Sequence, residues 1–203
     1  MFISFEGIDG SGKSTQARLL ADALRAQGLS VLEVREPGGT RLGEEIRALL
    51  LDPGQDVDPR AELLLFSAAR AHLVASTIAP SLEAGEVVIA DRFFDSSTVY
   101  QGAGRGIANP RWLHSLHEFA TSGLSPSRTY LVDVPADVAA ARRSPEADRM
   151  EAAGQEFYQT VRAAYLDLAR AEPNRVLVVD GMPAPEAVHT LILSDASRLL
   201  AGG

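Results

Sequence analysis

The sequence FEGIDGSGKST at residues 5–15 decides the fold. It matches G-x-x-x-x-G-K-[ST] from Gly7 to Ser14, a loop whose backbone N–H groups surround the phosphates of ATP or GTP while the lysine reaches the outer phosphates. The pattern requires a strand before it and a helix after it. Residues 1–5 predict a buried strand, and residues 14–27 carry apolar side chains on one helical face. A turn of this kind without a ligand is the alternative, but the flanking strand and helix favour a phosphate-binding loop.

Lys13, inside this loop, is the only lysine among the 19 basic residues of the chain, and all the others are arginine. A lysine is a slim point charge that can follow a phosphoryl group inside a tight loop, where a planar guanidinium is too wide. The position of the single lysine therefore strengthens the prediction of a phosphate site.

Length and composition limit the class of protein. A chain of 203 residues is expected to form a single domain, residues 1–203, with a substantial core. The absence of cysteine excludes disulfides and thiol catalysis and fits a reducing compartment. We see no leader sequence and no apolar run that approaches a membrane span, so we expect a cytoplasmic protein without a membrane partner. The net charge of −8 argues against a nucleic-acid partner and favours a small anionic ligand held by a local positive cluster.

Strands and helices are predicted to alternate along the chain, which indicates an α/β fold. The expected architecture is the three-layer P-loop NTPase fold, a five-stranded parallel sheet flanked by helices on both faces, with a short lid. The predicted strands are residues 1–5, 30–35, 86–92, 129–133 and 175–180. The predicted helices are residues 14–27, 41–51, a long one from about 60, 110–121, 135–143, about 148–171 and 185–200.

Four local expectations accompany this assignment. Residues 62–74 are apolar almost all round a helix and should be buried against the sheet or another subunit. Residues 95–97 read as a helix cap, and the glycine-rich residues 102–106 as a flexible loop. Trp112 is expected to pack inside.

Asp91 and Arg92 directly follow the apolar strand at residues 86–90. The carboxyl ends of parallel strands meet at the ligand-binding edge of an open sheet. A carboxylate there can hold the water shell of Mg²⁺, and an arginine can bind a second phosphate. The alternative is a simple surface ion pair.

The loop Glu36-Pro37-Gly38-Gly39-Thr40 follows the second predicted strand. Pro37 restricts Glu36 to an extended conformation, and the glycines permit a sharp, close-approaching turn. Local chemistry does not distinguish a plain connector from a ligand loop, but the position at a strand end favours a ligand loop.

Two pairs of aromatic and polar side chains could recognise a base. Phe66 and Arg70 are four residues apart and therefore share one helical face. From these residues alone, a core phenylalanine and a surface arginine are the preferred interpretation. Tyr100 and Gln101 offer a flat ring and an amide that both donates and accepts, as recognition of a nucleobase edge requires.

A basic segment interrupts the last third of the chain. Arg142, Arg143 and Arg149 flank a break at residues 144–146, with few apolar residues to anchor it. We predict a mobile lid at about residues 141–151 that brings cationic groups to bound phosphates. A solvated basic turn is the alternative.

Five motifs in this order resemble thymidylate kinase, the family that converts dTMP to dTDP with ATP. The phosphate loop alone is shared with many NTPases, whereas the loop at residues 36–40 and the Asp-Arg pair are specific. The matching segments are residues 5–15, residues 35–40, Phe66 with Arg70, Asp91-Arg92, and Tyr100-Gln101-Gly102 with Arg105-Gly106.

The resemblance implies roles on the ATP side. Lys13 would bind the β and γ phosphates, while Ser14 and Asp91 would hold Mg²⁺. It also implies a homodimer. The implied ATP-binding residues are Gly7, Ile8, Asp9, Gly10, Ser11, Gly12, Lys13, Ser14 and Thr15.

On the acceptor side, the resemblance implies that Arg92 holds the dTMP phosphate and that Asp9 approaches the 3′-hydroxyl. Phe66 would stack on thymine, Arg70 would bind its carbonyl edge, and Tyr100 would disfavour a ribose. The implied dTMP-binding residues are Asp9, Glu36, Pro37, Phe66, Arg70, Arg92, Ser96, Ser97, Tyr100 and Gln101. The implied catalytic residues are Lys13, Arg92, Asp9, Arg142, Arg143 and Arg149.

The chain departs from some family patterns. Gly10 and Ser11 occupy loop positions where one branch of the family carries an arginine, so the chain resembles the bacterial branch, in which the lid supplies that charge. Phe93 follows Arg92 where a tyrosine or histidine is common. In-line phosphoryl transfer without a covalent intermediate is the expected reaction. The rivals are another P-loop kinase and a nucleotide-dependent switch.

Overall fold

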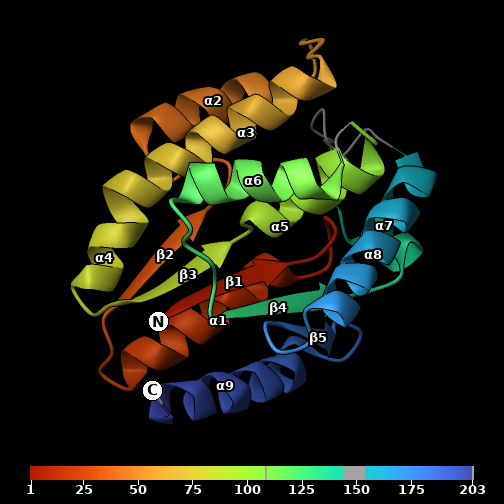
Figure 1. The fold of residues 1–203 in the computed structure, drawn as a ribbon. Coiled ribbons are helices and arrows are strands. Elements are labelled where there is room, and N and C mark those ends of the chain that lie inside the picture. The colour runs from red at the N-terminus through yellow and green to blue at the C-terminus, as the bar shows by residue number, and fades with distance from the viewer. Residues whose placement is uncertain (108, 144–153, 203) are drawn as a thin grey trace.

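Five parallel strands form the centre of the computed structural model, which describes residues 1–107, 109–143 and 154–202. Their order across the sheet is β2-β3-β1-β4-β5, so the strand before the phosphate loop lies in the middle (Figure 1). All five strands predicted from the sequence are confirmed. They are β1 (Phe2–Glu6), β2 (Val31–Arg35), β3 (Val87–Asp91), β4 (Arg128–Asp133) and β5 (Val176–Asp180).

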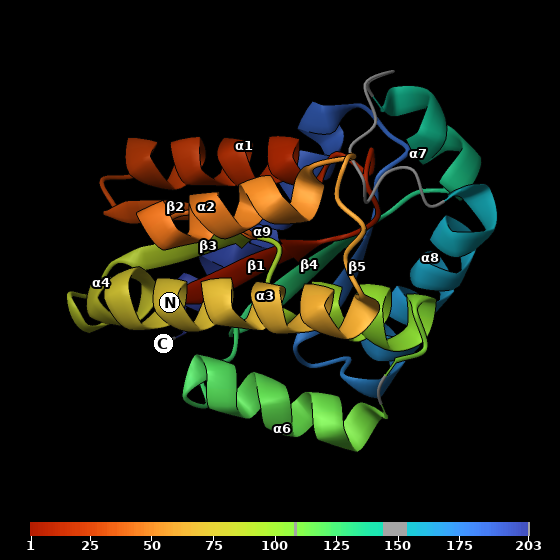
Figure 2. The same cartoon turned by 90° about the horizontal axis from the view of Figure 1, so that it is seen from above.

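Helices cover both faces of the sheet and make the predicted three layers. Figure 2 shows α1 and α3 on opposite sides of the sheet, with α6 outermost beside α3. Apolar side chains of α1 and α9 pack with strand residues on one face, and those of α3, η1 and α8 pack on the other. The helices are α1 (Lys13–Ala26), α2 (Arg41–Leu51), α3 (Pro59–Leu73), η1 (Val74–Ile78), α4 (Ala79–Glu83), α5 (Phe94–Ser97), η2 (Thr98–Gly104), α6 (Pro110–Thr121), α7 (Ala136–Arg142), α8 (Gly154–Ala171) and α9 (Pro185–Ala201).

The helix after residue 60 is buried against the domain on one side only, and its burial against another subunit stays a prediction. Leu63 and Leu73 are buried, but Leu64 is 54% exposed, because only one side of the helix packs on the domain. With η1 and α4 the helix continues over Pro59–Glu83, which is long and apolar enough by length and composition to cross a membrane, contrary to our expectation. Its buried side carries Glu62 and Arg70, both paired with other polar side chains, as in a core helix.

Three other local expectations are wrong, one of them in part. The loop expected at residues 102–106 is wrong in part: residues 102–104 belong to the π-helical segment η2, where Gly102 and Gly104 let the side chains of α6 and α8 approach the backbone, and only Arg105 and Gly106 lie outside it. Asp95 does not cap a helix, since its carboxylate accepts two hydrogen bonds from Arg175. Trp112 lies on α6 and is 48% exposed.

Candidate functional site

The phosphate loop joins β1 to α1 through three glycines with left-handed backbone. Gly7, Gly10 and Gly12 have φ of 141°, 87° and 95°, a region that only glycine adopts without strain. α1 begins at Lys13, so the free N–H groups of its first turn face the loop. A helix start of this kind binds phosphate through its N–H groups and its dipole.

A cavity of about 530 Å³ lies against this loop. Its walls combine the loop and α1 with Arg142 of α7 and the segment that precedes α9. Most of the predicted ATP-binding residues line it, while Gly7, Ile8 and Asp9 do not. The side chain of Ile8 is instead buried in the core. The lining residues are Gly10, Ser11, Gly12, Lys13, Ser14, Thr15, Gln16, Val132, Arg142, Gly181, Pro183, Pro185 and Val188.

The structure explains why Gly10 carries no side chain. A Cβ added to Gly10 would lie 2.2 Å from the backbone oxygen of Ala139, which is far inside van der Waals contact. An arginine at this position would therefore require the backbone of α7 around Ala139 to move. The charge that one branch of the family places here has no room in this chain.

Arg92 stands at the carboxyl end of β3, and its backbone has φ of 73°, which is unusual for a residue with a side chain. Its guanidinium contacts Asp9 at 2.5 Å, Ser96 at 2.9 Å and the Tyr100 hydroxyl at 3.2 Å. The simple surface pair between Asp91 and Arg92 is therefore wrong. Arg92 turns inward, across the end of β1, to the acid of the phosphate loop.

Asp9 collects four donors. Lys13 lies 3.4 Å and Arg92 2.5 Å from one carboxylate oxygen, and the hydroxyls of Tyr100 and Tyr158 donate to the other at 3.1 and 3.2 Å. Burial alone would raise the pKa of Asp9, but the charges of Arg92 and Lys13 and the hydrogen bonds outweigh it, so this pKa lies well below its usual range. Asp9 is therefore a fixed negative charge between two cations.

Lys13 and Asp91 complete the polar edge of the phosphate loop. Burial and the positive charge of Arg92 lower the pKa of Lys13, and Asp9, Asp91 and Glu6 offset part of this effect. One carboxylate oxygen of Asp91 is buried with no hydrogen-bond partner among the described residues. Within that part of the chain no group of three or more His, Cys, Asp or Glu side chains could hold a metal ion.

A second pocket opens beside Asp9 and Arg92. Nine of the ten residues that the resemblance assigns to dTMP line it, and they come from the stretch of chain between the end of β1 and η2. Of the ten, only Arg70 is missing from its walls. Arg47 and Leu51 of α2 also line it, and we did not predict them. The lining residues are Asp9, Glu36, Pro37, Arg47, Leu51, Phe66, Arg92, Ser96, Ser97, Tyr100 and Gln101.

Arg70 lies behind this pocket. It is 1% exposed, so the interpretation as a surface arginine is wrong. Its guanidinium pairs with Glu36 at 2.6 Å and donates to Ser97 and to the backbone oxygen of Phe93. Its Nη1 has no hydrogen-bond partner among the residues described. The loop at residues 36–40 is thus tied to α3 by a buried ion pair.

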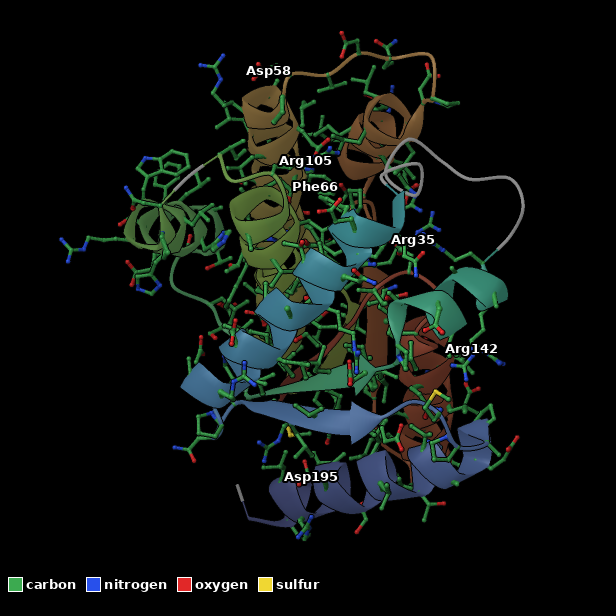
Figure 3. The ribbon with its side chains drawn as sticks, turned by 90° about the vertical axis from the view of Figure 1, so that its right-hand side faces the viewer. Arg35, Asp58, Phe66, Arg105, Arg142 and Asp195 are labelled. Atoms are coloured by element: carbon green, nitrogen blue, oxygen red, sulfur yellow. The ribbon has the colours of Figure 1, made fainter. Side chains whose placement is uncertain are left out.

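The arginines of the predicted lid separate into two positions. Arg142 lines the phosphate-loop cavity and donates to the backbone oxygen of Gly181 at 3.1 Å. The guanidinium of Arg143 lies 4.2 Å from the centre of the Tyr158 ring, whose hydroxyl contacts Asp9. Figure 3 shows Arg142 far from Phe66 of the second pocket. Arg149 and most of the lid at about 141–151 lie outside the described residues.

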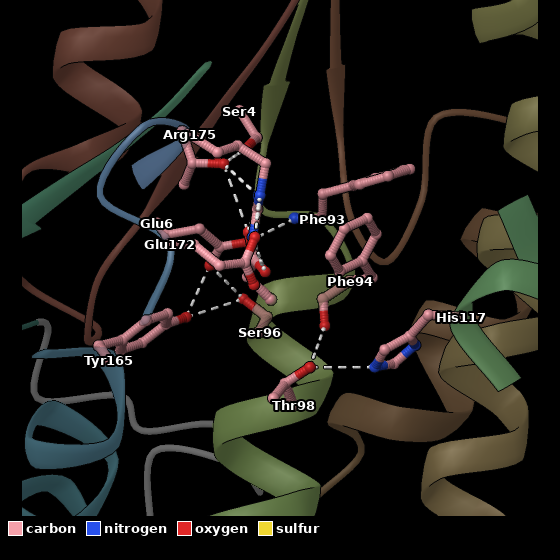
Figure 4. Close-up of polar contacts among 12 residues, drawn as sticks. Ser4, Glu6, Phe93, Phe94, Ser96, Thr98, His117, Tyr165, Glu172 and Arg175 are labelled. Carbon is pink, nitrogen blue, oxygen red and sulfur yellow. Dashed lines mark hydrogen bonds and ion pairs between the residues drawn. The ribbon is translucent and has the colours of Figure 1, made fainter. Parts of the chain in front are cut away.

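Glu6 is a site residue that we did not predict. It is fully buried at the end of β1, and it accepts hydrogen bonds from the Phe93 N–H at 2.8 Å and from Ser96 and Tyr165 at 2.6 Å each (Figure 4). Ser96 in turn accepts from Arg92, so Glu6 supports the guanidinium through one intermediate residue. The sequence held one signal for this role, which is an acidic residue at the end of an apolar strand.

Tyr158 and Tyr165 of α8 are further residues that sequence reasoning missed. Their hydroxyls contact Asp9 and Glu6, which lie about 150 positions earlier in the chain. The helical period of α8 indicates buried tyrosines but not their partners. Their polar roles depend on how α8 packs over the end of β1.

We predict a pH dependence of stability from Glu6. Burial and the negative charge of Asp95 raise the pKa of Glu6 to about 7, and Arg92 offsets part of the effect. The folded protein therefore holds this proton more tightly than the unfolded chain, so stability is present below the usual pKa of 4.5 and is lost as pH rises to 7. Between pH 5 and pH 8, the free energy of unfolding of Glu6→Gln should rise by on the order of 3 kcal/mol relative to that of the unsubstituted chain. Urea unfolding across this range measures the difference, and parallel curves would contradict the assignment.

Comparisons with known proteins identify a family. The family model for thymidylate kinase matches residues 5–192. The chain is 51% identical to a thymidylate kinase of Bifidobacterium longum strain DJO10A over 98% of both proteins. It is 53% identical to a thymidylate kinase of Symbiobacterium thermophilum, over 93% of this chain and 89% of the relative.

A solved structure agrees with these sequences. The crystal structure of thymidylate kinase from Ehrlichia chaffeensis matches 97% of this chain and 98% of its own with a TM-score of 0.82. The two chains are 36% identical. The fold and most of the length are therefore shared.

Proposed function

The chain belongs to the thymidylate kinase family and phosphorylates dTMP to dTDP with ATP, a step of dTTP synthesis, and from this premise we propose how its residues divide the reaction. ATP would occupy the phosphate-loop cavity, and dTMP the pocket beside Arg92. The observation that carries this assignment is the position of Asp9 between the two sites. Its carboxylate touches Lys13, which lines the first site, and Arg92, which lines the second. The donor and acceptor phosphates would therefore meet across this residue.

In the acceptor pocket, Arg92 would hold the dTMP phosphate. The guanidinium is already fixed by Ser96 and Tyr100, so little side-chain freedom would be lost on binding. Phe66 would stack on the thymine ring. Arg70 lies behind the pocket wall, so the contact with a carbonyl oxygen of the base would require its buried Nη1, which has no hydrogen-bond partner among the described residues, to become accessible. Tyr100, held against Arg92 and Asp9, would exclude a 2′-hydroxyl.

On the donor side, Lys13 and the N–H groups of the loop would bind the ATP phosphates. Ser14 and Asp91 would hold Mg²⁺, and the buried, unpartnered oxygen of Asp91 fits that role. Mg²⁺ commonly takes only one or two protein ligands together with substrate phosphates, which agrees with so small a ligand set. Bound there, the ion would neutralise charge on the ATP phosphates.

Two lid arginines would have different tasks. Arg142, tied to Gly181 beside the phosphate-loop cavity, would contact the nucleotide of ATP. Arg143, stacked on Tyr158 next to Asp9, would contact the transferring phosphoryl group. Its buried Nη1 has no hydrogen-bond partner in the described part of the chain, so a donor is available.

The chemistry would be in-line transfer of the γ-phosphoryl group of ATP to a phosphate oxygen of dTMP. That oxygen is already anionic at neutral pH, so no strong general base is required. The protein would act by alignment and by neutralising charge with Lys13, Arg92 and Arg143.

A panel of nucleoside monophosphates tests the proposal. With ATP and Mg²⁺, dTMP should be converted stoichiometrically to dTDP, purine monophosphates should not react, and chelation of the metal should stop turnover. Release of inorganic phosphate without a diphosphate product would favour a nucleotide-dependent switch instead.

We also propose a cytoplasmic homodimer. Leu64 of α3 and Trp112 of α6 line an apolar groove on the outer surface, and Phe119 of α6 is 85% exposed. An apolar surface of this kind marks an interface in a soluble protein. Sedimentation equilibrium should give the mass of two chains, and the mass of one chain would rule the dimer out.

A further inference from the structure

Glu62, in the first turn of α3, is a completely buried acid to which the sequence motifs assign no role. One carboxylate oxygen accepts a hydrogen bond from the side-chain amide of Gln101 at 2.9 Å. The other oxygen accepts from the Arg105 guanidinium at 3.4 Å. Both donors come from η2 or its end, so Glu62 fastens the wall of the acceptor pocket to α3.

A carboxylate can only accept hydrogen bonds, so it dictates the orientation of any amide that it contacts. Gln101 must turn its NH₂ group toward Glu62. Its side-chain oxygen then points away from Glu62, and no described residue donates a hydrogen bond to that oxygen. Because Gln101 lines the acceptor pocket, a hydrogen-bond acceptor is available to the ligand.

We propose that Glu62 is a positioning residue for base selectivity: by holding the amide of Gln101, it makes the pocket accept pyrimidines whose N3 carries a proton. Thymine and uracil present an N3–H donor beside a carbonyl oxygen. Cytosine presents the inverse pattern, an N3 acceptor beside an amino group. The Gln101 oxygen matches the first pattern and opposes the second.

This inference rests on the proposed placement of dTMP in the pocket of Phe66 and Gln101. Arg105 makes it testable, because its guanidinium can only donate hydrogen bonds and therefore faces the oxygen of any amide at position 62. In Glu62→Gln only one oxygen remains, and the charged Arg105 should take it. The NH₂ of the new amide would then face Gln101. To accept this hydrogen bond, Gln101 must turn its own oxygen toward position 62, and its NH₂ then faces the base.

The test compares kcat/KM of Glu62→Gln with dTMP, dUMP and dCMP. We expect kcat/KM with dTMP to fall about 10-fold or more, because two donors would oppose each other at N3. The ratio of dTMP to dCMP should fall by a similar factor. The ratio of dTMP to dUMP should not change, since both bases carry N3–H. General damage to the fold would lower all three substrates together, and unchanged ratios would overturn the proposal.

Two further variants separate the possible failures. Arg105→Gln removes the same ion pair but leaves the carboxylate, so the ratio of dTMP to dCMP should remain. In Gln101→Met, adding Glu62→Gln should cause no further loss of that ratio, because Glu62 acts only through Gln101. If Gln101→Met alone left dTMP kinetics unchanged, the placement of the base would be wrong. Suppose instead that Gln101→Met impaired the kinetics with dTMP while Glu62→Gln left the ratio of dTMP to dCMP unchanged. The placement of the base would then stand, and only the role of Glu62 would be wrong.

Discussion

Replacing Lys13 by alanine should lower kcat by roughly 10³-fold or more while the affinity for dTMP changes little. The ammonium lies in the wall of the phosphate-loop cavity, where it would follow the phosphoryl group in the transition state. Arg92 remains in the variant, so the acceptor phosphate keeps its anchor. Steady-state kinetics with ATP and dTMP, combined with equilibrium binding of dTMP, measure both quantities.

Lys13→Arg is the matched control for this result, because it preserves the charge but not the shape. Lys13 is 7% exposed, and a planar guanidinium does not fit so tight a loop. We therefore expect Lys13→Arg to remain severely impaired. Turnover of Lys13→Ala within about tenfold of the unsubstituted enzyme would contradict the assignment of the loop.

Removing the side chain of Arg92 should lower kcat/KM for dTMP by about 10² to 10³, with a small change in KM for ATP. The loss has two sources. The acceptor phosphate would lose its cation, and the partly buried charge of Asp9 would lose its closest partner, at 2.5 Å. Initial rates at varied dTMP and saturating ATP provide the measurement.

The backbone at Arg92 determines which substitution isolates this effect. Its φ of 73° is strained for alanine but not for glycine. Arg92→Gly should therefore unfold at a higher temperature than Arg92→Ala. The kcat/KM for dTMP should fall by a similar factor in both variants. Unchanged kinetics with dTMP in Arg92→Gly would show that the acceptor phosphate binds elsewhere.

Much of the site is predictable because its signals are local. The glycines and the lysine at residues 5–15 specify a phosphate loop through turn chemistry, and an acid and a base after a buried strand indicate the ligand-binding edge of the sheet. Of the nine residues in one pocket that the resemblance assigns to dTMP, all but Ser96 and Ser97 belong to the sequence motifs. The burial of Arg70 was not predictable, because an arginine on a helical face has the same local pattern whether it reaches solvent or a buried acid.

Local patterns in the sequence were thus enough for the phosphate loop, the five strands and the α/β class, because the periodicity of side chains and the demands of tight turns act over a few residues. The strand order β2-β3-β1-β4-β5 and the partners of Asp9, Glu6 and Glu62 came only from packing. Apart from Asp9 with Lys13, four positions away, these pairs join residues between 39 and 159 positions apart, and a buried charge is stable only where folding brings it a partner. Which donors meet at each carboxylate is therefore a property of the folded chain.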